Sequence, residues 1–251
     1  MSRKIALVTG ATSGIGKATA LLLAENGFDI IACGRREERL AALKEELNGK
    51  CGFFSLSFDV RDKEAVAKEI GSLPERWSKI DLLVNNAGNA HGLAPIQDGD
   101  LEDWDAMIDI NVKGLLYVSK AVIPGMVARG VGQVINIGSI AGKEVYPNGN
   151  VYCASKFAVD ALTAGMRRDL YDKGIRVSQV CPGMVETEFG LVRFKGDEER
   201  AASIYKGYQP LTAEDVADAI CYMATRPAHV NVADMLLLSS DQAASTMINK
   251  K

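Results

Sequence analysis

Residues 4–16 read KIALVTGATSGIG, and this stretch decides the fold. The apolar run at residues 4–9 predicts a buried strand, and a helical pattern at residues 15–26 begins directly behind the glycines. Glycine permits a tight turn straight off a strand and lets backbone approach a pyrophosphate closely. The helix that begins here would direct its free N–H groups at phosphates. The stretch therefore predicts a nucleotide site, with a plain tight turn as the alternative.

Short apolar runs alternate with amphipathic segments along the chain. Most runs are continuously apolar, as in strands that helices cover on both faces. Strict alternation predicts an α/β protein: a single-domain Rossmann fold over residues 1–251, whose seven-stranded, doubly wound parallel sheet has helices on both faces. Strands are expected at residues 4–9, 29–33, 52–58, 80–84, 133–137, 176–181 and 235–238. Helices are expected at residues 15–26, 36–47, 63–70, 101–129 with a break near 111–113, 151–172 and 214–225.

Composition excludes several classes of protein. The chain has 251 residues, 47% hydrophobic and 24% charged, which excludes a disordered chain. The net charge of −3 gives no basic field for nucleic acid. No apolar run approaches the roughly 18 residues of a membrane span, and residues 5–8 are too short for a signal-peptide core, so a cytoplasmic location is expected. Five cysteines without a C-x-x-C pair and two separated histidines argue against disulfides, a metal site and a Ser-His-Asp triad.

Two arginines follow the second predicted strand, where residues 33–36 read CGRR. An NAD site usually has an acid here, about 20 residues after the glycines, that binds the ribose 2′-hydroxyl. Instead, Arg35 and Arg36 stand where a 2′-phosphate would arrive. Guanidinium groups pair with phosphate through two parallel hydrogen bonds. The predicted cofactor is therefore NADP(H); the alternative is that residues 35–39 are only a solvated helix start.

Polar residues follow other predicted strands at the carboxyl edge, where α/β sheets bind ligands. Asp59 is placed to bond the adenine amino group, although it could instead cap the helix near Asp62. Residues 85–88 read NNAG after the fourth strand, and Ser139 follows the fifth. Asn111 interrupts the long helical stretch between them. These residues are expected to meet at one site.

Tyr152 and Lys156 are four residues apart and therefore share one face of a helix. A free phenol titrates near ~10, too high for proton transfer at neutral pH, but a nearby cation lowers that value. The pair predicts an acid–base group suited to an alcohol or an alkoxide.

Together these motifs resemble the short-chain dehydrogenase/reductase family. The resemblance implies that Tyr152 donates or accepts the proton, that Lys156 lowers its pKa and holds the nicotinamide ribose, and that Ser139 bonds the substrate oxygen. It implies that Asn111 holds a water in a proton relay. It also implies contacts of Asn86, Ala87 and Gly88 with the adenosine side of the cofactor, and of Pro182, Gly183, Val185 and Thr187 with the nicotinamide.

Three further segments, at residues 34–40, 192–197 and 227–231, resemble the NADP-dependent 3-hydroxy acid dehydrogenases of that family. That group oxidises L-serine, L-allo-threonine and related acids, or reduces aldehyde acids such as malonic semialdehyde, and is typically tetrameric. Many NADP enzymes of the wider family carry a basic residue before the middle glycine, where this chain has Ser13. The 2′-phosphate would then depend on Arg35 and Arg36.

The expected activity is hydride transfer between NADP(H) and a small 3-hydroxy or 3-oxo acid. The irregular stretch 182–210 is expected to form a substrate lid, in which Arg193 or Lys195 pairs with the substrate carboxylate; the alternative is that both are solvated or contact a neighbouring subunit. Two other functions compete with this one. The first is a 3-oxoacyl-carrier-protein reductase, for which Arg129, Arg167 and Arg168 could supply a basic entrance; the second is a non-catalytic NADP sensor.

The expected cofactor-binding residues are Gly10, Thr12, Ser13, Gly14, Ile15, Gly16, Arg35, Arg36, Asp59, Val60, Asn86, Ala87, Gly88, Tyr152, Lys156, Pro182, Gly183, Val185 and Thr187. The expected catalytic residues are Asn111, Ser139, Tyr152 and Lys156.

Overall fold

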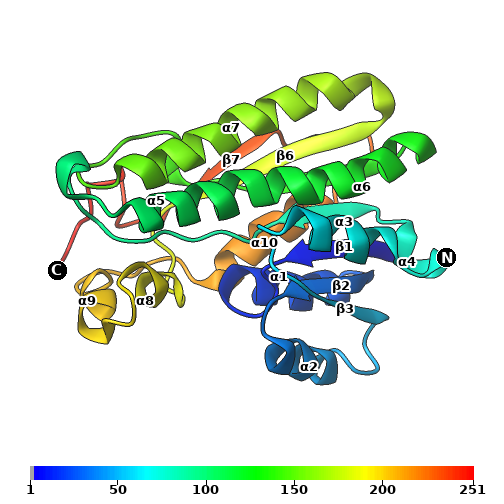
Figure 1. Ribbon diagram of the computed structural model, residues 1–251, viewed down its shortest axis with the longest axis horizontal. Coiled ribbons are helices and arrows are strands. Elements are labelled where there is room, and N and C mark those ends of the chain that lie inside the picture. Colours follow the sequence, from blue (N-terminus) through cyan, green and yellow to red (C-terminus); the bar gives the residue numbers. More distant parts are fainter. Residues whose placement is uncertain (1–2) are drawn as a thin grey trace.

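One parallel sheet organises the chain, in the strand order β3-β2-β1-β4-β5-β6-β7 (Figure 1). The computed structural model describes residues 3–251. The order reverses between β1 and β4, and the carboxyl edge beside such a reversal is where doubly wound sheets bind ligands. The strands are β1 Lys4–Thr9, β2 Phe28–Gly34, β3 Phe53–Ser57, β4 Leu82–Asn85, β5 Gly132–Ile137, β6 Ile175–Pro182 and β7 Asp234–Leu237.

Helices connect the strands and cover both faces of the sheet. They are α1 Gly14–Glu25, α2 Glu37–Glu46, α3 Lys63–Gly71, α4 Glu75–Ser78, α5 Leu101–Ile108, α6 Leu115–Arg129, α7 Asn150–Leu170, α8 Phe189–Arg193, α9 Glu198–Ser203 and α10 Ala213–Ala224.

The predicted break near residues 111–113 is not an interruption of the helix. The backbone forms a π-helix at Asp109–Gly114, so that α5 runs into α6 without a loop. The capping pattern before α10 forms as a full capping box between Thr212 and Asp215. The stretch expected as an irregular lid contains α8 and α9.

The core lies on both sides of the sheet because alternate strand residues point to opposite faces. Ala6 and Val8 of β1 pack with residues of α1, α2 and α10. Ile5 and Leu7 pack with residues of α3 and α6. This two-sided burial explains the continuously apolar strands and confirms the doubly wound fold.

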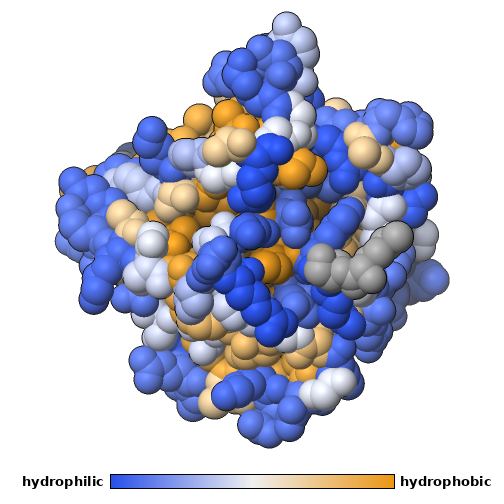
Figure 2. Space-filling model, turned by 90° about the vertical axis from the view of Figure 1, so that its right-hand side faces the viewer, coloured by the Kyte–Doolittle hydropathy of each residue, from blue (hydrophilic) through white to orange (hydrophobic). Residues whose placement is uncertain are grey.

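The two ends of the sheet differ in what lies near them. Figure 1 shows α8, α9 and the C-terminus at the end opposite the N-terminus, where the strands have their carboxyl ends. Figure 2 shows the N-terminal end, where hydrophilic residues surround smaller hydrophobic areas. Within residues 3–251, no helix combines the length and apolarity needed to cross a membrane.

Candidate active site

A cavity of about 580 Å³ opens at the carboxyl edge of the sheet. It brings together residues from the carboxyl ends of six strands, β1 to β6, and from the stretch expected as a lid. All the residues expected to bind the cofactor line it except Gly16, and Ser139 and Arg193 line it as well. Gly16 lies behind the turn, where an added Cβ would be 2.3 Å from the Gly10 carbonyl oxygen.

The glycine turn at residues 10–16 leaves an open space beside its backbone, which side chains in place of the glycines would fill. Gly10 has a φ of +65° and Gly14 a φ of +50°, conformations that L-residues with a Cβ rarely adopt. A Cβ at Gly10 would lie 2.9 Å from the Asn86 amide nitrogen. The Asn86 side chain in turn donates to the Thr9 carbonyl oxygen at 2.8 Å, which joins the turn to the end of β4. The backbone is therefore open to a flat, phosphate-bearing ligand, as an NADP(H) site requires.

Arg36 lies against this turn. Its Nη2 donates to Ser13 Oγ at 2.8 Å and to Thr12 Oγ1 at 3.1 Å, and its Nη1 pairs with Glu188 at 3.1 Å. Arg35 is more exposed, and its Nη1 lies 3.4 Å from Asp59 Oδ2. The residues thus fit a 2′-phosphate beside Arg36, with the Ser13 hydroxyl next to it.

Asp59 lines the cavity, but its carboxylate is already engaged. It accepts hydrogen bonds from the backbone and the guanidinium of Arg61. Burial acts to raise the pKa of Asp59, but the bonds from Arg61 and the charge of Arg35 hold it below its usual value. The alternative role as a helix cap is wrong, because Asp62 caps α3 with its own side chain.

Ser139, Tyr152 and Lys156 meet at the inner end of the cavity, and each is only 8% exposed. Tyr152 and Lys156 lie one turn apart on α7, which packs on β6 and on the turn after β5. Lys156 Nζ donates to the Ile137 carbonyl oxygen at 2.9 Å and lies 6.0 Å from the centroid of the Tyr152 ring. The spacing expected from the sequence therefore places a phenol, a hydroxyl and an ammonium together.

Burial governs the charges of these groups. It raises the pKa of Tyr152 well above its ordinary value, and the neighbouring Tyr146 adds to this, whereas the hydrogen bond from Ser139 and the charge of Arg193 oppose it. Burial lowers the pKa of Lys156 to about 8. Any added positive charge beside Tyr152 would therefore favour the phenolate.

The Asn111 side chain ties three segments together from within the π-helix. Its Oδ1 accepts from the Asn89 backbone at 2.9 Å, and its Nδ2 donates to the Asn89 carbonyl oxygen at 2.8 Å and to Ser155 Oγ at 3.0 Å. Both amide hydrogens are thus used. The arrangement fixes the segment after β4 against α7, and a role in holding water remains a hypothesis.

The two cations expected in the lid have different surroundings. Arg193 Nε donates to the Gly92 carbonyl oxygen at 3.1 Å, and its guanidinium carbon lies 5.7 Å from the centroid of the Tyr152 ring. Lys195 is exposed and pairs with Asp103 at 2.9 Å and Asp100 at 3.2 Å. Lys195 lines a neighbouring cavity of about 260 Å³, which Arg193 and Tyr152 also border. The structure thus places the Arg193 guanidinium beside the Tyr152 ring, whereas the Lys195 ammonium is paired with two carboxylates.

Sequence reasoning missed several residues that line the large cavity. Arg193 lies over the Tyr146 ring: the guanidinium carbon of Arg193 is 5.6 Å from the centroid of the Tyr146 ring. Glu188, in the stretch expected as a lid, pairs with Arg36. The only local signal for Tyr146 was its place between Ser139 and Tyr152. The chain end contributes Gln242, Ser245, Ile248 and Lys250.

Comparison with known proteins places these features in one family. Residues 4–196 match the family model described as short chain dehydrogenase. The chain is 49% identical to the "NADP-dependent 3-hydroxy acid dehydrogenase YdfG" of Salmonella typhi over 229 residues, which cover 91% of this chain and 92% of that protein. It is 48% identical to the "Sulfoacetaldehyde reductase 2" of Chromohalobacter salexigens, with 96% of each chain covered.

A solved structure agrees with this assignment. The closed form of serine dehydrogenase complexed with NADP⁺ superposes with a TM-score of 0.92 at 45% identity, covering 95% of this chain and 96% of that one. The two chains therefore share one fold over almost their whole length. The chain is a member of the short-chain dehydrogenase family.

Proposed function

We propose that this protein transfers a hydride between NADP(H) and a small 3-hydroxy or 3-oxo acid of the L-serine, L-allo-threonine or 3-hydroxypropionate type. One observation carries the proposal: the Arg193 guanidinium lies 5.7 Å from the Tyr152 ring. A cation so close to the proton-transfer group suits a short substrate whose anionic group is two or three bonds from the reacting carbon. The relatives named for 3-hydroxy acid and serine dehydrogenase support the same substrate class.

The chain's own residues supply proton transfer and orientation. A bound nicotinamide would supply the hydride acceptor or donor. In the direction of oxidation, Tyr152 Oη takes the proton of the substrate hydroxyl while the Ser139 hydroxyl bonds the same oxygen. Lys156 stabilises the phenolate by its charge and holds the nicotinamide ribose. The lid, through Arg193, orients the substrate and excludes water.

NADP(H) is supported by the residues beside the glycine turn. Arg36 already donates to Ser13 and Thr12, so its guanidinium is held where a 2′-phosphate would be bound. The second strand ends without the acid that would favour NAD. A relative named as NADP-dependent and a neighbour solved with NADP⁺ agree with this choice.

The competing functions receive less support. Arg129, Arg167 and Arg168 were the arginines expected to attract an acidic carrier protein. Each donates to a backbone carbonyl oxygen, and in the part of the chain that the structure describes none lines the cavity. A non-catalytic sensor would not require Ser139, Tyr152 and Lys156 together.

A second substrate class follows from Arg193, because a guanidinium pairs with a sulfonate as well as with a carboxylate. The relative named sulfoacetaldehyde reductase is nearly as similar to this chain as the 3-hydroxy acid dehydrogenase. The test is therefore a panel: oxidation of L-serine, L-allo-threonine and 3-hydroxypropionate with NADP⁺ and with NAD⁺, and reduction of malonic semialdehyde, sulfoacetaldehyde and an acyl thioester with NADPH. The expected result is turnover of the carboxylates with NADP(H). Turnover of the acyl thioester alone would favour a 3-oxoacyl-carrier-protein reductase. Turnover of sulfoacetaldehyde alone would favour a reductase of small sulfonates.

We also propose that the protein is a homotetramer, as the resemblance to the 3-hydroxy acid group implies. Exposed apolar side chains on α7 and β7, Phe157 at 40% and Leu236 at 49%, support a subunit contact there. Light scattering coupled to gel filtration would give about four times the 26.9 kDa of one chain.

A further inference from the structure

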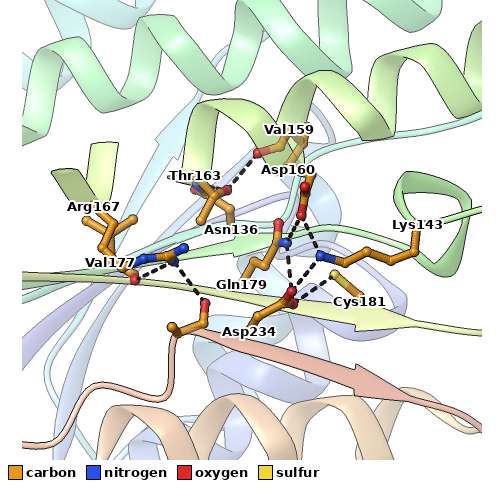
Figure 3. Close-up of polar contacts among 11 residues, drawn as sticks. Asn136, Lys143, Val159, Asp160, Thr163, Arg167, Val177, Gln179, Cys181 and Asp234 are labelled. Atoms are coloured by element: carbon orange, nitrogen blue, oxygen red, sulfur yellow. Dashed lines mark hydrogen bonds and ion pairs between the residues drawn. The ribbon is translucent and has the colours of Figure 1, made fainter. Parts of the chain in front are cut away.

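Five side chains from four separate segments form a polar cluster beside the catalytic helix. Figure 3 shows Lys143, Asp160, Gln179, Cys181 and Asp234 directed toward one another. Lys143 Nζ lies 2.5 Å from Asp160 Oδ1 and 2.5 Å from Asp234 Oδ2. One lysine thus bridges α7 and β7 from the turn that follows β5. We call these five residues the Lys143 cluster.

The remaining members complete the cluster from β6. The Gln179 side-chain amide, which is buried, donates to Asp160 and, at 3.3 Å, to Asp234. The buried Cys181 thiol lies 3.5 Å from Asp234 Oδ1. Both carboxylates are therefore held from two sides, by Lys143 and by Gln179. Because each carboxylate is partly exposed, these bonds hold it in place more than burial does.

The Lys143 cluster is connected to the reacting groups at two points. Lys143 is four residues after Ser139, and the intervening turn is tight: its Gly142 N–H donates to the Ser139 carbonyl oxygen at 2.9 Å. Asp160 is four residues after Lys156 and eight after Tyr152, so the three side chains share one face of α7. The Lys143–Asp160 bond thus joins the segment that carries Ser139 to the helix that carries Tyr152.

The two segments also pack closely between these points. A Cβ added at Gly142 would lie 2.7 Å from the Lys156 carbonyl oxygen. With so little space, a shift of the turn along α7 would move the Ser139 hydroxyl relative to the phenol. A misplacement of about 1 Å between reacting groups can cost about 100-fold in rate.

We propose that Lys143 is a positioning residue: its bridge to Asp160 and Asp234 sets the Ser139 hydroxyl against the Tyr152 phenol. The inference rests on the proposed function, because it assigns Lys143 a role in proton transfer. The hydrogen bond from Ser139 opposes the rise in the pKa of Tyr152. Loosening the cluster therefore raises that pKa further as well as slowing the reaction.

The first test replaces Lys143 by Met, which keeps most of the stem and removes the charge. We expect kcat to fall about 10- to 100-fold while KM for NADPH changes less than about twofold. A shift of the pH profile is the discriminating result. The rise of kcat/KM for oxidation with pH reports the pKa of the base in the free enzyme, so this rise should move to higher pH in the variant. Lys143→Arg, which can still bridge two carboxylates, should restore most of the rate and the original profile.

Removal of the lysine leaves two carboxylates facing each other, and that variant could fail to fold. A triple variant, Lys143→Met with Asp160→Asn and Asp234→Asn, removes all three charges together. It should show the same loss of kcat and the same shift of the pH profile. A matched control is Arg76→Met, which breaks the pair between Arg76 and the buried Asp29, 3.0 Å apart. The control should keep both kcat and the profile.

A double-mutant cycle separates positioning from general destabilisation. In a Ser139→Ala background the proposal requires that Lys143→Met costs little further activity, because the hydroxyl that it positions is already gone. Independent, additive losses would overturn the proposal. So would an unchanged pH profile in the Lys143→Met and triple variants.

Hydrogen exchange gives a readout that needs no substrate. Amides of residues 139–145 should exchange faster in the triple variant than in the unmodified protein, while those of Arg76→Met match the unmodified protein there. Equal exchange would overturn the positioning role. Lack of turnover of the whole substrate panel by the unmodified protein would instead contradict the proposed function, so that the two failures are distinguishable.

Discussion

Glu188 Oε2 lies 3.1 Å from Arg36 Nη1, which ties the residue before α8 to the arginine that lies against the glycine turn. The other oxygen of Glu188 pairs with Arg39 at 2.7 Å. Burial acts to raise the pKa of Glu188, but the two arginines hold it below its usual value, so the group is an anion at neutral pH. A 2′-phosphate beside Arg36 would therefore compete with a carboxylate for the same guanidinium.

Replacing Glu188 by Gln should strengthen the binding of NADPH. Removal of one exposed like charge is worth up to about 1 kcal/mol, or roughly fivefold in Kd. NADH, which lacks the phosphate, should bind within about twofold of its original affinity. Titration of intrinsic or cofactor fluorescence gives both constants, and weaker binding of NADPH would mean that Glu188 orients Arg36 instead of competing for it. Glu46→Gln, which removes a similarly exposed partner of Lys17, is the matched control.

Replacement of Arg36 by Leu should reduce the preference for NADPH. A charge-assisted hydrogen bond contributes about 1.5–3 kcal/mol, so kcat/KM with NADPH should fall about 10- to 100-fold while that with NADH stays nearly constant. Exchange of Gly34 for Asp is the less direct route, because a Cβ there would lie 2.4 Å from Thr12 Cγ2. Equal losses with both cofactors would show that Arg36 supports the glycine turn without reading the phosphate.

Tyr152→Phe should leave folding and the Kd for NADPH nearly unchanged, while kcat falls at least about 100-fold. The ring would keep its edge contact with Phe189, whose centroid is 5.7 Å away, but the titrating hydroxyl would be gone. Steady-state kinetics with thermal unfolding of the same preparation checks both halves. Full turnover in this variant would exclude Tyr152 as the proton-transfer group.

The parts of the site that were predictable are those written in short stretches of sequence. The glycine turn follows its strand directly, and Tyr152 and Lys156 share a helix face by spacing alone. Each of these depends on contacts a few residues apart, where periodicity and turn chemistry decide the geometry. Their positions therefore follow from the sequence without knowledge of the tertiary contacts.

The other residues meet only through tertiary contacts. Glu188 is 152 residues from Arg36, and Asp234 is 91 residues from Lys143. No local pattern marks such pairs, because each partner reads as an ordinary surface charge. Asn111 is intermediate: a change in the helix is visible in the sequence at this residue, but a π-helix in place of a break, and the bonds of its side chain to Asn89 and Ser155, are not.

Lys156→Met should make the protein more stable at neutral pH even though it abolishes activity. Burial lowers the pKa of Lys156 to about 8, whereas the unfolded chain holds this proton up to about pH 10.4. The unfolded state thus binds more protons between these values, so the stability of the unmodified protein rises with pH across that window. Below pH 8 the buried charge of Lys156 costs the folded protein its full amount, about 3 kcal/mol of stability. The gain in the variant is this amount minus the contribution of the lost hydrogen bond to Ile137.

Denaturant unfolding of both proteins from pH 7 to 10.5 measures this difference. The stability advantage of Lys156→Met should be greatest at pH 7 and should disappear as the pH approaches 10.5. Tyr152→Phe, measured alongside, should show no such narrowing over pH 7 to 9. An advantage that is independent of pH would mean that the pKa of Lys156 is the same in the folded and the unfolded protein.

Arg193→Gln should raise KM for 3-hydroxypropionate far more than for its uncharged amide, which has nearly the same shape. A carboxylate in a mostly apolar cleft needs a charged partner to offset its desolvation, and loss of that partner costs about 10- to 100-fold. Arg193 Nε already bonds Gly92, but the guanidinium faces the Tyr152 and Tyr146 rings within the cavity. Lys195→Gln is the control, because its ammonium is neutralised by Asp100 and Asp103 outside that cavity. It should change KM for the acid and the amide equally. If Arg193→Gln did the same, Arg193 would only fasten the lid to Gly92, and the partner of the carboxylate would have to be sought elsewhere in the cavity.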